Sequence, residues 1–233
     1  MRELSRTGAA IPGTSMLLSE QHVLLFSYQN DPAGEQSRFL ARLPVSALQR
    51  QNEDLVSALQ TLNAEGRWEN GFWPGRARTL MPDRATEMSV HFHPKLAPAH
   101  QWIAVYGAPI QVDNDGGGQP KPSGTIYLRS AAQPEGPWSP RVSLQQIPEV
   151  EPPSDPDLAC YAAKEHPAFG TRNSLVITYV CNLFAVSEGD QLAVLQKLQK
   201  DMSLYRPRVL ELPIPAELLS PKVRTGATGP AGD

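Results

Sequence analysis

Two histidines stand two residues apart, His91 and His93, in the segment SVHFHPKL. Alternate residues of a strand project to the same face, so both imidazoles could serve as ligands of one zinc ion. A structural zinc site needs four ligands, and no third ligand stands at a spacing typical of one. His93 is followed by proline, as is His166, and this recurrence favours a structural role in a turn. We therefore expect no metal and no other cofactor.

The chain has two cysteines, Cys160 and Cys181. If residues 160–166 and 175–181 form an antiparallel hairpin with His166 opposite Leu175, the same register places Cys160 directly opposite Cys181. We expect the two cysteines to be neighbours, and to form a disulfide if the protein is exported to an oxidising compartment.

The elements that would position these residues recur along the chain. Strand-like runs rich in β-branched and aromatic residues occupy residues 22–28, 102–107 and 174–180. Their tyrosines, at positions 28, 106 and 179, are 78 and 73 residues apart. Such a nearly constant interval indicates a repeated structural unit.

Each unit is predicted to be an antiparallel meander of about four strands, the composition of a propeller blade. Further strands are expected at residues 37–44, 124–131 and 204–215, with fourth strands near 67–68 or 76–80 and near 138–144. Two short helical insertions interrupt the pattern: one is capped by Asn52, and the other begins near Ser187. Apolar residues at helical spacing predict that both helices pack on the sheets: Leu55, Leu59 and Leu62 on the first, and Leu192, Leu195, Leu198 and Met202 on the second.

The fold class is therefore predicted to be all-β, with the chain divided into consecutive blades. Residues 1–84 would form a first, partial blade with a helical insertion, and residues 85–150 a second blade. Residues 151–221 would form a third blade with the other insertion. Residues 222–233 contain almost nothing to bury, and we expect a disordered tail there.

Charge and hydropathy exclude two classes of partner. The net charge is −3 and the basic residues are scattered, so nucleic acid is not expected to bind. The longest apolar runs, such as residues 23–28, are too short to span a bilayer, so no membrane insertion is expected. The first residues lack the apolar segment of a secretory signal, and the compartment stays open. Secretion would require a signal peptide upstream of Met1.

Several segments together resemble a known family. They are TEMSVHFHPKLAPAHQWIAVYG, TIYLRSAAQPEGPWSP, HPAF, LVITYVCN and YRPRVLELP. They are similar to the later blades of five-bladed β-propellers related to glycoside hydrolases, in particular the domain of unknown function 4185 family. The likeness covers roughly residues 85–215 and is weaker over residues 11–73. It implies five blades around a central funnel, of which this chain holds about three, the C-terminal ones.

The resemblance also implies a function. Glycosidic cleavage needs two carboxyl groups at a set separation, and in the related hydrolases the early blades, absent here, contribute the aspartates. We expect a carbohydrate-active or glycan-binding piece of such a propeller, non-catalytic by itself, with a saccharide as its ligand. One alternative is a glycoside hydrolase that is active only when missing N-terminal blades or other copies of the chain complete the ring. A second is a structural module that binds proteins.

By the same resemblance, five polar residues are candidates for the funnel wall. Glu87 opens an innermost strand and could act as a general acid if burial raised its pKa. The simpler interpretation of Glu87 is a solvated glutamate at a strand end. The candidate saccharide-binding residues are His91, Arg129, Lys164 and His166. Glu135, in the sequence PEGPW, is interpreted as part of a turn and not as a catalytic acid.

Overall fold

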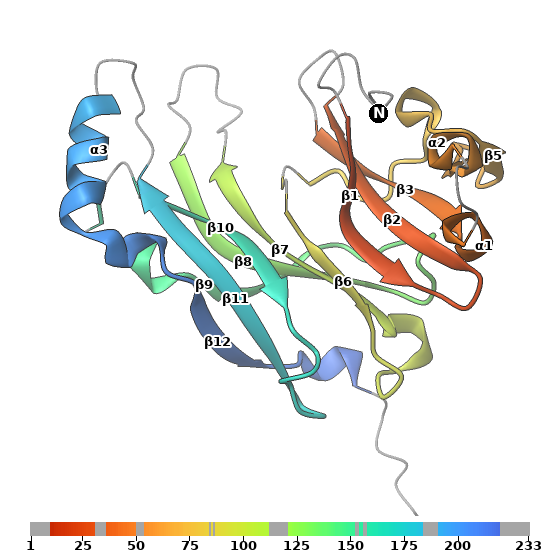
Figure 1. Cartoon of the computed structure of the whole chain (residues 1–233). Coiled ribbons are helices and arrows are strands. Elements are labelled where there is room, and N and C mark those ends of the chain that lie inside the picture. The colour runs from red at the N-terminus through yellow and green to blue at the C-terminus, as the bar shows by residue number, and fades with distance from the viewer. Residues whose placement is uncertain are drawn as a thin grey trace, which may run out of the picture.

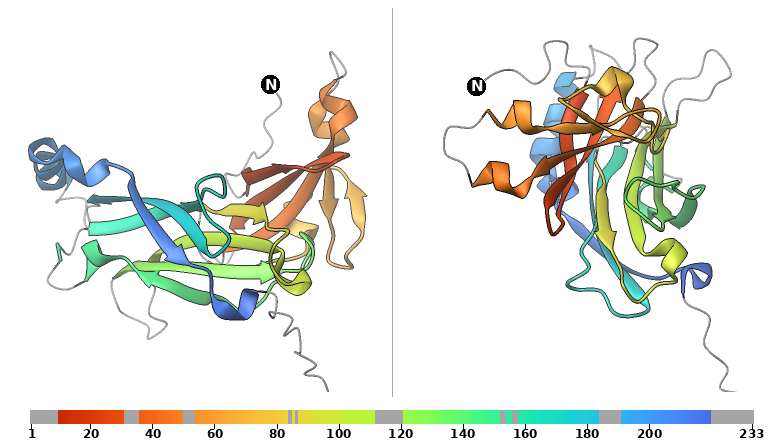
Figure 2. Two further views of the ribbon diagram at one scale, coloured as in Figure 1. Left: turned by 90° about the horizontal axis from the view of Figure 1, so that it is seen from below. Right: turned by 90° about the vertical axis from the view of Figure 1, so that its right-hand side faces the viewer.

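The chain folds into three antiparallel β-sheets, as a computed structural model shows (Figure 1, with two further views in Figure 2). The all-β class predicted from the sequence is confirmed at this level, and no sheet of the described residues closes into a barrel. The structure describes residues 10–30, 36–49, 54–83, 85, 87–111, 121–151, 154–155, 158–183 and 191–219.

Each sheet is built from one continuous stretch of chain, with neighbouring strands consecutive in sequence. The first sheet contains β1 (Ala10–Leu18), β2 (His22–Asn30), β3 (Gln36–Pro44), β4 (Gln60–Leu62) and β5 (Trp68–Asn70). The second contains β6 (Ser89–Phe92), β7 (Trp102–Gln111), β8 (Lys121–Ala131) and β9 (Val142–Gln146). The third contains β10 (Leu158–Glu165), β11 (Ser174–Leu183) and β12 (Arg208–Pro213). The strands predicted from the aromatic repeats are β2, β7 and β11.

The first strands of the three sheets lie side by side. The Val90 amide of β6 donates to Ser15 Oγ of β1 at 3.0 Å. On its other side β6 meets β10, where the Glu165 amide donates to Ser89 Oγ at 2.7 Å. The strand β6 therefore joins the first sheet to the third, through its backbone at Val90 and its side chain at Ser89.

The second sheet is buried on both faces, which explains the continuous apolar run of β7. Ile103 and Val105 face the third sheet and join a core with Ile177 and other residues of β11. Ala104 and Tyr106 point the other way and join a second core with Phe26, Leu40 and neighbouring residues of the first sheet. A strand covered on both sides loses the usual alternation of apolar and polar residues.

The helices are shorter than the sequence predicts. They are α1 (Val45–Leu48), α2 (Leu55–Ala58) and α3 (Gln191–Lys200). The helix predicted to reach Leu62 ends at Ala58, because Leu59 is extended and residues 60–62 form strand β4, which pairs with β3 and β5. Its N-cap is Asp54, which accepts from the Val56 amide at 3.2 Å. Asn52, Ser187 and the tail from residue 220 onward lie outside the described residues.

The prediction that the leucines of α3 all pack on the sheets is wrong. Leu192 and Leu195 are exposed, whereas Val194 is buried and Leu198 packs against the core between the second and third sheets. Among the described residues, no helix is both long enough and apolar enough to cross a membrane.

Single turns of 3₁₀ helix complete the regular structure. They are Pro74–Arg76, Pro98–His100, Pro148–Val150, Met202–Tyr205 and Ala216–Leu218.

The predicted register of the β10–β11 hairpin is correct at the two cysteines and wrong at the other end of the hairpin. Cys160 lies opposite Cys181, as expected, and the two sulfurs form a disulfide. The predicted pairing of His166 with Leu175 is wrong, because the register shifts by one residue between Tyr161 and Lys164. Ala162 adopts a left-handed φ of 55° at this point, which is typical of a β-bulge. The shift places Glu165 opposite Ile177.

Candidate functional site

Three polar side chains on one face of β6 and its extension contact a single residue of β10. Ser89 Oγ accepts from the Glu165 amide. His91 Nε2 lies 3.2 Å from the Glu165 carbonyl oxygen. His93 Nε2 lies 3.0 Å from Oε1 and 3.1 Å from Oε2 of the Glu165 carboxylate. A carbonyl oxygen only accepts hydrogen bonds, so His91 carries a proton on Nε2. These contacts fix the end of β6 against β10.

The carboxylate in this cluster is shielded from water. The Glu165 side chain is 1% exposed, and the His93 side chain is 16% exposed. Burial lowers the pKa of His91, while the Glu165 charge and carbonyl act in the opposite direction. His91 is therefore neutral at pH 7. The charged forms of His93 and His166 would lower the pKa of His91 further. His166 is therefore close enough to His91 for its charge to act on that imidazole.

A cavity of about 340 Å³ opens beside His93. One wall is the end of β6, with Phe92, and the segment that follows it, with His93 and Lys95. The opposite wall is the turn between β10 and β11, with Thr171 and Arg172. Two sheets therefore form this cavity, which we call the His93 pocket. The contact of His93 with Glu165 holds the two walls together.

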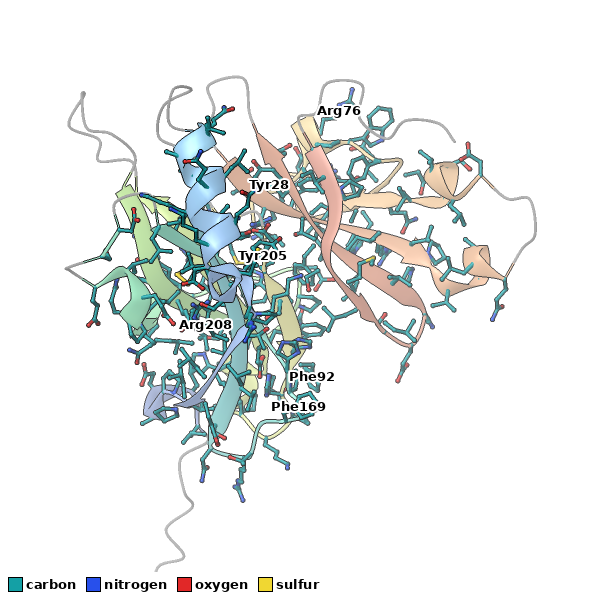
Figure 3. All side chains as sticks on the ribbon, turned by 60° about the vertical axis from the view of Figure 1, so that its left-hand side comes forward. Tyr28, Arg76, Phe92, Phe169, Tyr205 and Arg208 are labelled. Carbon is teal, nitrogen blue, oxygen red and sulfur yellow. A yellow bond between two sulfur atoms is a disulfide. The ribbon has the colours of Figure 1, made fainter. Side chains whose placement is uncertain are left out.

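Two exposed phenylalanines lie at the His93 pocket: Phe92 lines it, and Phe169 belongs to the turn whose residues 167 and 170–172 line it. Phe92 is 46% exposed, and its ring packs against Trp102 with 5.5 Å between centroids. Phe169 is 75% exposed and stands in the turn between β10 and β11, with its ring 6.5 Å from that of His166. Figure 3 shows both phenylalanines at the same end of the molecule. Their apolar faces are available for stacking.

Arg129 lies away from this pocket, between the first and second sheets. Its guanidinium forms two hydrogen bonds with the Asp83 carboxylate, at 2.6 and 3.1 Å, and a third with Tyr106 Oη at 3.1 Å. Both charged side chains are largely buried, with 11% and 7% exposed. Burial lowers the pKa of Arg129, but the Asp83 hydrogen bonds and the neighbouring charges outweigh it and raise the pKa overall. Arg129, which the sequence predicts to bind a saccharide, therefore has a structural role through these contacts.

Glu87 precedes β6, whereas His93 follows it, so the two residues lie at opposite ends of that strand. Glu87 is half-buried, and its charge raises the pKa of the buried Arg38. Burial is the larger effect on Arg38 and lowers its pKa to about 10. The Glu87 charge also raises the pKa of Tyr161 on β10, after burial and the contact with Tyr205. Glu87 thus acts on residues of the first and third sheets, and it does not line the His93 pocket.

The other two predicted residues flank Glu165 in sequence. His166 Nε2 lies 2.7 Å from Thr178 Oγ1, and Lys164 is half-buried opposite the same threonine. The structure therefore brings His91 and His166 together around Glu165. Glu165, the acceptor of the cluster, was missed by the sequence-based prediction. The alternation of Ser89 and the two histidines was the signal that a polar partner faced β6.

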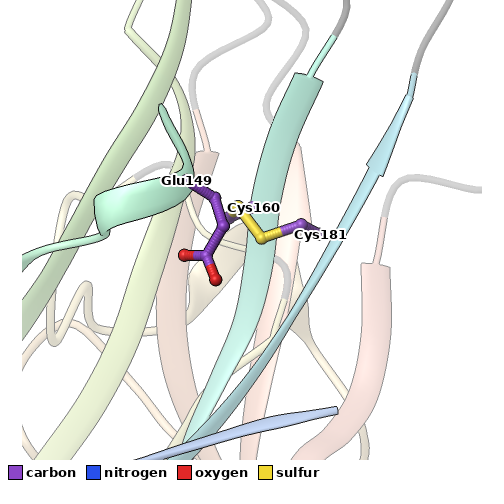
Figure 4. A group of neighbouring side chains, drawn as sticks. All are labelled: Glu149, Cys160 and Cys181. Carbon is purple, nitrogen blue, oxygen red and sulfur yellow. A yellow bond between two sulfur atoms is a disulfide. The ribbon is translucent and has the colours of Figure 1, made fainter. Parts of the chain in front are cut away.

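One group of metal-ligating residue types lies within 4.8 Å in the described part of the chain: Glu149, Cys160 and Cys181 (Figure 4). Both sulfurs are taken up by the disulfide. The Glu149 carboxylate binds Arg208 Nε at 2.6 Å and accepts from Tyr179 Oη at 2.9 Å. This group is a structural tie between the 3₁₀ turn at residues 148–150 and the third sheet.

Comparisons with known proteins support the fold. No protein-family model and no curated protein sequence matches the chain. A crystal structure named as that of a "putative hydrolase" from Bacteroides ovatus superposes with a TM-score of 0.52 at 16% sequence identity. The match covers 84% of this chain and 43% of that chain. The chain therefore spans less than half the length of this neighbour, and it shares the fold of that part.

Proposed function

We propose that the chain is the saccharide-binding part of a hydrolase-like β-propeller of the five-bladed type, and that the saccharide binds in the His93 pocket. The observation that carries this proposal is the pocket itself. It combines the exposed aromatic ring of Phe92 with a histidine that a buried carboxylate holds in place. Sugars are recognised by stacking of their apolar faces on aromatic rings and by oriented polar groups.

Two observations support the propeller. The sheets are meanders of consecutive strands, and their first strands lie side by side, as the inner strands of neighbouring blades do. The hydrolase-like neighbour is more than twice as long as the part that matches this chain. A ring of five blades, with further blades outside this chain, accounts for both observations.

The chain alone is proposed to be non-catalytic. Glycoside cleavage requires two carboxyl groups that flank the scissile bond. Among the described residues, none of those that line the His93 pocket is acidic, and the Glu165 carboxylate that binds His93 is buried. The alternative of a hydrolase completed by other copies of the chain predicts a stable oligomer. Light scattering that shows a soluble monomer would exclude that alternative.

A glycan array followed by calorimetric titration of its hits tests the proposal. We expect Phe92→Ala to weaken saccharide binding about tenfold, which corresponds to about 1.4 kcal/mol, because one stacking surface is lost. Glu87→Ala is the matched control at the other end of β6, and its affinity should equal that of the wild type. Melting temperatures establish that both variants fold.

Two results would contradict this proposal. If Glu87→Ala abolishes binding while Phe92→Ala does not affect it, the saccharide binds at the funnel end of β6. If no glycan binds, the protein-binding module is the better interpretation.

A further inference from the structure

The charge of the His93 pocket differs from that of the chain as a whole. The ionisable side chains that line it are those of Lys95, Arg172 and His93, all of which are basic. The acidic partner of His93, Glu165, has a side chain that is 1% exposed and directed at His93. The whole chain carries a net charge of −3. Positive charge is thus concentrated here in a protein that is acidic overall.

Lys95 and Arg172 stand on short segments that the backbone holds in shape. The segment of Lys95 is closed by the Leu96 amide, which donates to the His93 carbonyl at 3.1 Å, and Leu96 pairs with Leu219. In the turn of Arg172, the Thr171 and Ser174 hydroxyls lie 2.7 Å apart. The two cations are therefore carried on opposite walls that are formed before any ligand binds.

The hydrogen-bonding capacity of these two side chains restricts the ligand. Lysine and arginine only donate hydrogen bonds, whereas a sugar hydroxyl both donates and accepts. Two such donors suit a group that only accepts and carries negative charge, such as a carboxylate or sulfate, and arginine can bind it through two parallel hydrogen bonds. The volume of about 340 Å³ is at the small end of the range for ligand pockets, which suits one terminal sugar unit.

We propose that the His93 pocket binds an acidic saccharide, whose carboxylate or sulfate pairs with Lys95 and Arg172 while its ring stacks on Phe92. This inference rests on the proposed function and adds the chemical class of the ligand. The ion pairs between the acidic group of the ligand and the side chains of Lys95 and Arg172 should weaken as ionic strength rises, because both cations are exposed to solvent.

The test is a titration against a panel of uronate-bearing and sulfated oligosaccharides and their neutral counterparts of equal length. Sodium sulfate and sodium acetate alone form a third arm. We expect the tightest acidic glycan to bind at least tenfold more tightly than its neutral counterpart and than either free anion. The double variant Lys95→Gln, Arg172→Gln should lose that difference and leave the neutral arm unchanged.

Matched controls are Lys200→Gln and Arg67→Gln, two exposed cations that do not line the pocket. Both should retain wild-type affinity. Equal affinity for acidic and neutral glycans would overturn the acidic ligand class while leaving saccharide binding intact. Binding of the free anions as tight as that of the acidic glycans would overturn the role of the sugar ring. If no glycan of the panel binds, both this inference and the proposed function are wrong.

Discussion

The His93 imidazole and the Glu165 carboxylate lie 3.0 Å apart, although 72 residues separate them and they belong to different sheets. Ser89 and His91 contact the backbone of the same glutamate. One residue of β10 therefore determines where the end of β6 lies, and with it one wall of the His93 pocket.

Glu165→Gln should destabilise the fold by about 1–3 kcal/mol, because the buried charge-assisted hydrogen bond to His93 becomes a neutral one. Urea unfolding measures the difference. Glu65→Gln changes an exposed glutamate far along the chain and should leave the free energy of unfolding unchanged. Identical stability of both variants would mean that the Glu165 contact contributes nothing.

Asp83→Asn should lower the free energy of unfolding by about 3–5 kcal/mol, more than Glu165→Gln does, because it leaves the largely buried Arg129 without its counter-charge. Saccharide affinity, measured where the variant is still folded, should stay at the wild-type value. Glu69→Gln removes the partner of the exposed Arg76 and serves as the control. Loss of saccharide binding at wild-type stability would instead restore the ligand-binding role that the sequence predicts for Arg129.

Acid should destabilise the protein through His91. Burial holds the pKa of His91 below its ordinary value of 6.5, so the folded state binds fewer protons than the unfolded state. The stability that depends on neutral His91 is present above pH 6.5 and is lost as the pH falls through the lowered pKa. His91→Gln should flatten the unfolding free energy between pH 7.5 and 5, whereas Gln133→Ala, at an exposed residue without an ionisable group, should keep the wild-type slope. Equal slopes in all three proteins would refute the role of His91.

Removal of the disulfide by the double variant Cys160→Ala, Cys181→Ala should lower the free energy of unfolding by about 2–4 kcal/mol. The bond closes a loop between residues 21 apart and joins the first two strands of the third sheet. Non-reducing mass spectrometry of protein from an oxidising compartment checks the bond itself. Two free thiols there would contradict it.

The strands were the most predictable part of the fold. The runs around Tyr28, Tyr106 and Tyr179 are rich in β-branched and aromatic residues, and that local composition is enough to place β2, β7 and β11. The opposition of Cys160 and Cys181 also follows from simple antiparallel counting. The bulge at Ala162 could not be predicted, because an alanine carries no sequence signal for a left-handed φ.

The candidate site was less predictable, because its contacts join different sheets. Glu165 and Asp83 give no periodic signal of their own, and their partners His93 and Arg129 come from strands far away in the sequence. A polar residue on a strand is often solvated, and only the packing of one sheet on another shows which polar residues are paired. The division of the chain into blades and the family resemblance stay predictions.

Hydrogen exchange of the protein, with and without the tightest saccharide of the glycan array, tests the location of the site most directly. Ligand binding at the His93 pocket predicts slower exchange in peptides that cover residues 92–96 and 167–172, and unchanged exchange near Glu87 and Arg38. Protection confined to the peptides of Glu87 and Arg38, or no protection at all, would contradict saccharide binding at the His93 pocket.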